Sequence, residues 1–244
     1  MHKRLLLLSN STNLGEDYLL YARQEIQKFL GASVKKVLFI PFAGVTLTFD
    51  AYTEKVGKVF KDIGYEIEAI HLADNDYQVI KQAEAIVIGG GNTFHLAHWL
   101  HKTQVIEIIK EIINNGIPYI GWSAGSNIAC PTIKTTNDMP IIEPISFNGL
   151  NIVPFQINPH YTDAVIPNHN GETREARIRE FLVVNPDIYV VGLKEGTMLK
   201  VESSSMKLVG NKTMRLFKFG EPIVEYDVNS NLDFLLDSQL APRP

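Results

Sequence analysis

The pentapeptide Gly121-Trp122-Ser123-Ala124-Gly125 matches the nucleophile-elbow pattern G-x-S-x-G. An apolar run at 117–120 precedes it and a segment of helical character at 126–129 follows it, so Ser123 would stand on a tight turn between a strand and a helix. The two glycines leave room for the crowded backbone of such a turn, and the N–H groups that begin the helix can face negative charge on a substrate oxygen. The pattern predicts that Ser123 is a nucleophile, with a Gly/Ser turn that has no chemistry as the structural alternative.

A second glycine turn, Gly89-Gly90-Gly91-Asn92-Thr93, also follows an apolar run and opens a helical stretch. A phosphate cradle is one interpretation of such a turn. However, the dinucleotide-binding pattern G-x-G-x-x-G is incomplete because Phe94 occupies its last position, and no G-K-S/T follows. Because a serine turn is also present, we favour an interpretation in which this turn adds a backbone N–H to that of Ala124 in an oxyanion hole. We therefore expect no nucleotide or other cofactor.

A serine nucleophile needs a general base, and histidine is the usual one. His160 follows Pro159, which restricts Asn158 to extended geometry and would fix the histidine just past the end of the apolar run 152–157. Parallel α/β sheets place their functional residues at such strand ends. We therefore predict that His160 is the base, with an ordinary loop histidine as the alternative.

Three more histidines, His95, His98 and His101, recur at every third residue of one expected helix, a pattern that could bind a metal ion. No carboxylate or cysteine joins them, and the zinc motif H-E-x-x-H is absent. We therefore interpret these histidines as a polar helix face and predict no metal.

The carboxylate that would orient His160 has two candidates. Asp138 lies in the loop-rich stretch 131–154, whereas Glu195 follows an expected strand and precedes Gly196. The residue types alone do not choose between them. A side chain at the carboxyl edge of a strand is held more rigidly than one in a loop, so we favour Glu195 and keep Asp138 as the alternative.

The elements that must position these residues alternate between apolar runs and helical periods in the first half of the chain. Continuous apolar strands separated by helices indicate an α/β fold with a mostly parallel sheet and helices on both faces. After Glu195, three short runs are typical of antiparallel hairpins that finish this sheet. No linker divides the chain, so we expect one domain spanning residues 1–244. The expected strands are 5–8, 37–40, 65–70, 85–88, 117–121, 188–191, 198–201, 206–209 and 214–219, and the expected helices are 17–30, 52–63, 93–115 and 172–184.

The composition indicates a soluble cytoplasmic protein. Of its 244 residues 45% are hydrophobic, and 23 Lys and Arg against 27 Asp and Glu give a net charge of −4, which argues against a nucleic-acid or membrane-surface partner. Cys130 is the only cysteine, so no disulfide forms within the chain and a reducing compartment fits. The four leucines at 5–8 are too few for a signal peptide, whose apolar region needs roughly 7–15 residues.

Six segments together resemble the peptidase E group of serine peptidase family S51, in the family's order. The resemblance covers almost the whole chain and is weakest after about Asp227. It implies a flavodoxin-like α/β fold related to the class I glutamine amidotransferases, and a cytoplasmic enzyme that hydrolyses dipeptides with an N-terminal aspartate. Carried over by position, it implies Ser123 as nucleophile, His160 as general base, and Gly91 and Ala124 as oxyanion hole, while Asp138 and Glu195 both remain candidates for the acid. The segments are 89–93, 121–127, 136–140, 158–161, 171–182 and 192–196.

Arg174 is the candidate for substrate binding. A guanidinium is a natural partner for a buried substrate carboxylate, because its donors match the carboxylate in two parallel bonds. Glu175 and Arg179 are four residues apart, the spacing of a surface pair, whereas Arg174 has Ile178 at that spacing and is freer to face a ligand. The resemblance also falls on Arg174, which favours this residue for the N-terminal aspartate of a small peptide.

Three other functions compete with this reading. An ordinary α/β-hydrolase shares the serine turn, but His160 follows Ser123 by only 37 residues, which leaves little room for the elements that normally separate them. A cyanophycinase-like peptidase of the same family would need a long groove. A catalytically inactive amidotransferase-like binding domain would have no reason to keep the serine, the glycine turn and the histidine together. The sequence leaves a monomer and a homodimer equally open.

Overall fold

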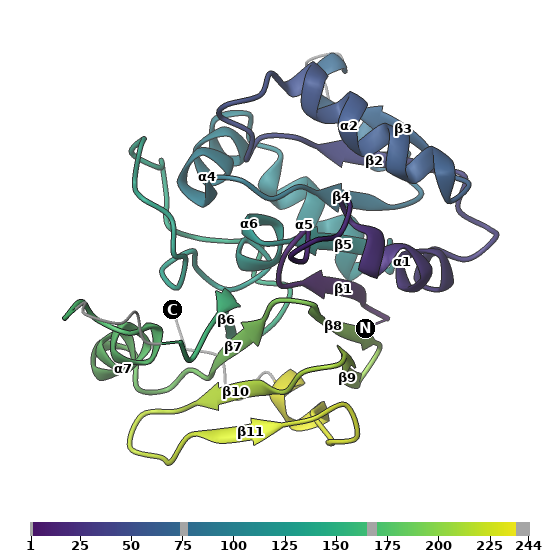
Figure 1. Cartoon of the computed structure of the whole chain (residues 1–244). Helices are drawn as coiled ribbons and strands as arrows, with labels where there is room; N and C mark the ends of the chain where they lie inside the picture. Colours follow the sequence, from purple (N-terminus) through teal and green to yellow (C-terminus); the bar gives the residue numbers. More distant parts are fainter. Residues whose placement is uncertain (1, 74–77, 165–169, 238–244) are drawn as a thin grey trace.

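The computed structural model describes residues 2–73, 78–164 and 170–237. Its main sheet has seven strands in the order β3-β2-β4-β5-β1-β8-β9 (Figure 1). Neighbouring strands from β3 to β1 pair in parallel, whereas β1–β8 and β8–β9 pair antiparallel, so the expected mostly parallel sheet is confirmed. The strands are β1 (Arg4–Leu8), β2 (Lys36–Ile40), β3 (Glu66–Ala69), β4 (Ile86–Ile88), β5 (Tyr119–Trp122), β8 (Thr197–Glu202) and β9 (Ser205–Gly210).

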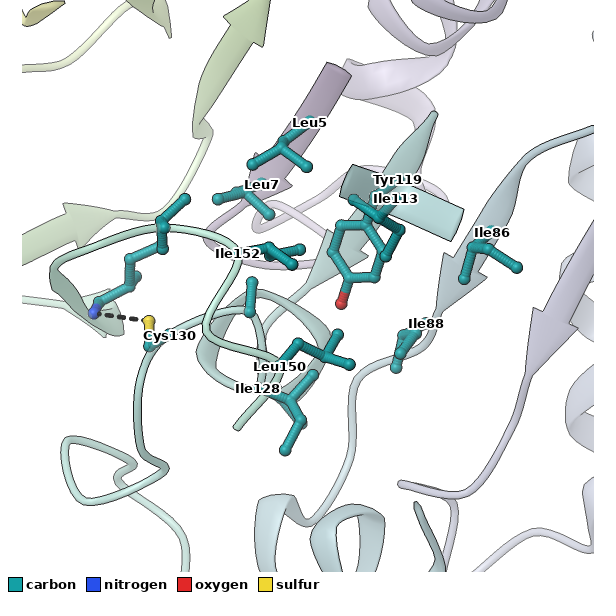
Figure 2. Packing of buried hydrophobic residues seen from close by; sticks show 14 of the residues in the cluster. Leu5, Leu7, Ile86, Ile88, Ile113, Tyr119, Ile128, Cys130, Leu150 and Ile152 are labelled. Carbon is teal, nitrogen blue, oxygen red and sulfur yellow. Dashed lines mark hydrogen bonds between the residues drawn. The ribbon is translucent and has the colours of Figure 1, made fainter. Parts of the chain in front are cut away.

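Helices cover both faces of this sheet, because side chains alternate between the two faces along each strand. Leu5 and Leu7 of β1 point into one buried cluster, and Leu6 and Leu8 point into the other. Figure 2 shows the first cluster, in which Leu5 and Leu7 lie near Ile152. Helices α4 (Thr93–Lys102), α5 (Ile106–Asn114) and α6 (Ala124–Asn127) contribute to the first cluster, and α1 (Arg23–Leu30) and α2 (Phe49–Asp62) contribute to the second.

A second sheet of four strands, in the order β11-β10-β7-β6, lies beside the first (Figure 1). The expectation that all the late runs finish one sheet is wrong at this point: β8 and β9 extend the main sheet, but β10 pairs with β7 and β11. The chain passes from the second sheet to the first through the tight turn between β7 and β8. Helix α7 (Arg174–Val184) packs on the second sheet through Ile178 and Leu182. The strands are β6 (Gln156–Tyr161), β7 (Val190–Lys194), β10 (Met214–Phe217) and β11 (Val224–Tyr226).

Two of the expected helices are interrupted at residues with positive φ. The helix expected over 17–30 begins as η1 (Leu20–Ala22) and continues as α1, after Leu19 with a φ of 57°. The helix expected over 93–115 divides into α4 and α5 at Gln104, which also has a φ of 57° and donates its N–H to the His101 carbonyl. Gln104 thus ends α4 by satisfying one of its last carbonyls, whereas Leu19 lies before η1 and delays the start of the first helix. Three short elements complete the described chain: η2 (Ile70–Leu72), α3 (Gln78–Lys81) and η3 (Asp233–Leu236).

Candidate active site

Ser123 stands between β5 and α6 in a strained backbone conformation, with φ 53° and ψ −112°. Its N–H donates to the Leu8 carbonyl at 3.1 Å. A Cβ on Gly121 would lie less than 3.0 Å from the Gly125 carbonyl, and a Cβ on Gly125 would lie as close to the Ile88 carbonyl. Both glycines of the pentapeptide are therefore required by the close approach of backbone atoms.

His160 brings its Nε2 to 2.8 Å from Ser123 Oγ. The histidine lies inside β6, and not past the end of a strand as the sequence predicted. The register of β6 on β7 shifts between Asn158 and Tyr161, and His160 has a φ of 53°, so a local irregularity turns its side chain toward the serine. The sequence cannot reveal this irregularity, because it depends on how β6 pairs with β7.

Glu195 completes a hydrogen-bonded row, with its Oε1 2.7 Å from His160 Nδ1. It occupies the turn from β7 to β8, where Gly196 has a φ of +83°. When Nδ1 carries the proton and donates to this carboxylate, Nε2 is free to accept a proton from Ser123. Both side chains are about half exposed. The row from Ser123 through His160 to Glu195 therefore has the geometry of a nucleophile, a base and an orienting acid.

Ser9 and Asn10, directly after β1, hold His160 and the turn of Glu195 in place. Ser9 Oγ accepts the His160 N–H at 2.9 Å and donates to the Leu193 carbonyl at 2.7 Å. Asn10 Oδ1 accepts the Gly196 N–H at 2.9 Å. Both side chains are buried. These two residues were not among the candidates predicted from the sequence, although they lie at the carboxyl end of a parallel strand, where functional side chains gather.

The glycine turn 89–91 lies against the serine. A Cβ on Gly90 would be 3.0 Å from Ser123 Cβ, and a Cβ on Gly91 would be less than 3.0 Å from the Ala43 carbonyl. The Tyr52 hydroxyl donates to the Gly90 carbonyl at 2.9 Å. Because the C=O and N–H of a trans peptide point in opposite directions, the Gly91 N–H faces away from Tyr52. The Ala124 N–H, the first of α6, has no acceptor within its own helix.

A cavity of about 700 Å³ opens beside Ser123 and His160. Asp138 and the glycine turn also border it, and among the described residues that line it Lys55 is the one lysine or arginine. Lys55 and its neighbours on α2 were not among the candidates predicted from the sequence. Residues 43–47 could have been predicted to border a ligand site, because they follow the carboxyl end of β2, where α/β sheets place ligands. The remaining lining residues are Ser11, Tyr18, Ala43, Gly44, Val45, Thr46, Leu47, Tyr52, Asn92, Trp122 and Ile141.

Comparisons with known proteins show the family of this chain. The model of peptidase family S51 matches residues 5–209. The chain belongs to peptidase family S51. It is similar to the peptidase E of Nostoc sp., with 71% identity over 97% of this chain and 98% of the relative, and to the peptidase E of Shigella flexneri, with 46% identity over 90% and 96%. The resemblance found in the sequence is thus confirmed, and the chain is a peptidase.

Two solved structures share the fold of this S51 peptidase. One is a putative peptidase E from Listeria monocytogenes, with a TM-score of 0.65 at 24% identity over 87% of this chain and 100% of that one. The other is a peptidase from an acI-B1 Actinobacterium, with a TM-score of 0.66 at 17% identity over 95% and 97%. They support the α/β fold that the resemblance implied. In the described part of this S51 peptidase no helix has both the length and the apolar character needed to cross a bilayer.

Asp138 of the S51 peptidase does not take the position beside His160. Its Oδ2 accepts the Thr93 N–H at 2.7 Å, the Thr93 hydroxyl at 2.6 Å and the Thr136 hydroxyl at 3.0 Å. These bonds fix the start of α4 directly after the glycine turn. Of the two sequence candidates, the structure therefore brings Glu195 to the histidine and places Asp138 at the wall of the cavity.

Arg174 is the first residue of α7, whose N-cap is Thr173. Its Nη1 donates to Asn137 Oδ1 at 2.6 Å, and Asn137 Nδ2 donates in turn to the Pro159 carbonyl, directly before His160. Burial lowers the pKa of Arg174, Arg177 lowers it further, and Asp138 opposes this shift. A guanidinium stays charged despite such a shift. Arg174 is thus held next to the site, although it does not line the cavity itself.

The three histidines of α4 each contact a different backbone carbonyl. His95 Nδ1 lies 2.6 Å from the Phe42 oxygen, His98 Nδ1 lies 3.0 Å from that of Glu143, and His101 Nε2 lies 2.9 Å from that of Asn148. Among the residues that the structure describes, no group of three potential ligands could hold a metal ion. These histidines tie α4 to the loops around it.

Proposed function

We propose that this S51 peptidase is a cytoplasmic serine dipeptidase that hydrolyses dipeptides with an N-terminal aspartate through an acyl-enzyme on Ser123. The observation that carries the proposal is the hydrogen-bonded row in which His160 lies 2.8 Å from Ser123 Oγ and 2.7 Å from Glu195. The peptidase E names of relatives at 71% and 46% identity support a peptidase, and the aspartyl substrate is what the resemblance seen in the sequence implies.

In the first step, Ser123 Oγ attacks the scissile carbonyl carbon while His160 Nε2 takes the hydroxyl proton. The carbonyl oxygen becomes an oxyanion, which the N–H groups of Gly91 and Ala124 stabilise. His160 then gives its proton to the leaving amine as the peptide bond breaks, and the aspartyl group stays on Ser123 as an ester. Glu195 stabilises the imidazolium that forms in between. Water, deprotonated by His160, then hydrolyses the ester.

Arg174 is the proposed partner of the substrate's aspartate side chain. Its contact with Asn137, and the contact of Asn137 with the backbone before His160, support a position next to the scissile bond. A substrate carboxylate that leaves water needs such a cation, because an unpaired buried charge costs several kcal/mol. Asp138 supports the site from the other side by fixing Thr93 after the glycine turn.

The test combines turnover with active-site labelling. Ser123→Ala should lower kcat for Asp-Leu by about 10⁴- to 10⁶-fold, by analogy with other serine triads. A fluorophosphonate should label the wild-type protein at Ser123 and leave the variant unlabelled. Full activity of the variant would end the proposal, and a wild type that is neither labelled nor active would favour an inactive binding domain. Preferential cleavage of aspartyl-arginine polymer would favour a cyanophycinase-like activity.

A further inference from the structure

Lys55 is a charged residue of the cavity that the chemistry of Ser123 does not use. It lies on α2 three residues after Tyr52, so the two side chains occupy one face of the helix. Its Nζ lies 4.1 Å from the centroid of the Tyr18 ring. Lys55 and Lys58 of this helix are both exposed, but Lys58 pairs with Glu54 at 2.8 Å.

A series of contacts through Tyr18, Tyr52 and Gly90 links the ammonium of Lys55 to Ser123. The Tyr18 hydroxyl lies 3.4 Å from that of Tyr52, and Tyr52 donates to the Gly90 carbonyl at 2.9 Å. Gly90 lies directly against Ser123. Lys55 therefore lies on the wall of the cavity that the glycine turn and α2 form.

The surroundings of Lys55 leave its charge available to a ligand. Among the residues that the structure describes, no carboxylate lies within ion-pair distance of its Nζ. Burial raises the pKa of both Tyr18 and Tyr52, so these phenols stay neutral and do not compete for the ammonium. A contact with an aromatic face stabilises a cation but leaves most of its N–H donors free.

A dipeptide with an N-terminal aspartate carries two carboxylates, one on its first side chain and one at its C-terminus. The C-terminal carboxylate distinguishes a dipeptide from a longer peptide, which has an uncharged amide at the same place. Apolar side chains that line the same cavity as Lys55, such as Leu47 and Val45, suit the side chain of a second residue. A carboxylate held among them needs a cation, and a peptide amide there would leave the lysine without a partner.

We propose that Lys55 binds the free C-terminal carboxylate of the substrate's second residue and thereby restricts this peptidase to dipeptides. This inference rests on the proposed function, and it assigns the second substrate charge, with Arg174 on the first. The C-terminal carboxylate is bound equally well in the ground state and in the transition state. Removing its interaction with Lys55 should therefore raise KM more than it lowers kcat.

The experiment compares Asp-Leu with Asp-Leu amide, in which the C-terminal carboxylate is replaced by a neutral group. Lys55→Met should lower kcat/KM for Asp-Leu on the order of 10- to 100-fold, mainly through KM, and should leave the amide unchanged. Lys55→Arg should restore most of the activity, because it restores the charge. Lys58→Met is the matched control, because Lys58 lies on the same helix but pairs with Glu54 and does not line the cavity, and this variant should hydrolyse both substrates like the wild type.

Several outcomes would overturn the inference. Wild-type enzyme that hydrolyses the amide as well as the free dipeptide would show that the carboxylate is not recognised. Equal losses on both substrates in Lys55→Met would assign Lys55 a structural role only. A loss of discrimination between Asp-Leu and Asn-Leu would assign Lys55 to the first carboxylate. If the wild type hydrolyses none of these substrates, the proposed function itself fails, which is a distinguishable result.

Discussion

Two regions of the molecule contribute differently to the candidate active site. One is the seven-stranded main sheet with the helices on its faces, here called the parallel half, and the other is the second sheet of four strands. The parallel half supplies Ser123 on a turn that is defined within five consecutive residues. The second sheet supplies His160 from an irregularity in β6, and Glu195 from the turn that leaves β7. The proposed nucleophile is therefore specified locally, whereas the positions of the proposed base and acid depend on how the two sheets are joined.

The junction between the two regions lies at the end of β1. Ser9 contacts the backbone of both His160 and Leu193, so one hydroxyl joins β1 to β6 and β7. Asn10 contacts the turn that carries Glu195 through Gly196. Buried hydrogen bonds of this kind are expensive to remove, because the partner is left unsatisfied. The alignment of Ser123, His160 and Glu195 therefore depends on a few polar contacts across the junction.

After Ser123, the largest effect is expected from Glu195, the proposed acid. Glu195→Gln should lower kcat about 10²- to 10⁴-fold, because an amide neither fixes the required tautomer of His160 nor stabilises its charged form. Asp138→Asn should lower kcat less than about 10-fold, since an amide oxygen still accepts bonds from Thr93. Steady-state kinetics on Asp-Leu measure both variants. A crippled Asp138→Asn beside a nearly normal Glu195→Gln would assign the acid to the parallel half.

Arg174→Ala should weaken the second sheet's contribution to substrate recognition. We expect kcat/KM for Asp-Leu to fall by a factor that corresponds to about 2–5 kcal/mol of lost transition-state stabilisation, because one side of a charge pair is removed. Labelling of Ser123 by a small neutral reagent should persist. Arg177→Ala is the matched control, because Arg177 is exposed and pairs with Glu172 at 3.5 Å.

The substrate series for Arg174 is Asp-Leu, Asn-Leu and Ala-Leu. Wild type should prefer Asp-Leu, and Arg174→Ala should lose that preference. If the variant keeps the preference for aspartate, or if wild type cleaves all three equally, charge pairing by Arg174 must be abandoned.

A smaller effect is expected from Ser9→Ala at the junction. The free energy of unfolding should fall by about 1–3 kcal/mol, because the His160 N–H and the Leu193 carbonyl both lose a buried partner. We expect kcat to fall roughly 10-fold through misplacement of His160. Ser126→Ala is the comparison within the parallel half, since Ser126 Oγ donates to the carbonyls of Leu8 and Gly121. Lower stability of Ser9→Ala with an unchanged kcat would mean that His160 is not positioned through Ser9.

No effect on activity is expected from metal removal. His95, His98 and His101 are engaged with backbone carbonyls of neighbouring loops, so they act as tethers of α4. Dialysis against EDTA should leave hydrolysis of Asp-Leu unchanged. Activity that is lost with EDTA and restored by zinc would contradict this interpretation and would indicate that the three histidines bind a metal ion.

Local patterns in the sequence determined much of the parallel half. The apolar runs at 5–8, 37–40 and 85–88 lie within or around strands β1, β2 and β4, because a strand covered on both faces must be apolar along its length. The spacing of glycines around Ser123 predicts the tight turn between strand and helix, because the backbone crowding in this turn involves residues that are close together in the chain. The candidate residues Ser123, His160 and Glu195 were likewise identified from residue types in their local context.

Only the tertiary structure decided how these pieces meet. The membership of β7 and β10 in a second sheet depends on which distant strands pair, and an apolar run carries no record of its partner. The choice of Glu195 over Asp138 beside His160 depends on the turn between the two sheets, and the roles of Ser9 and Lys55 depend on neighbours far away in the sequence. Periodicity reports burial and local conformation, whereas hydrogen bonds between distant segments form only when the packed core has brought those segments together.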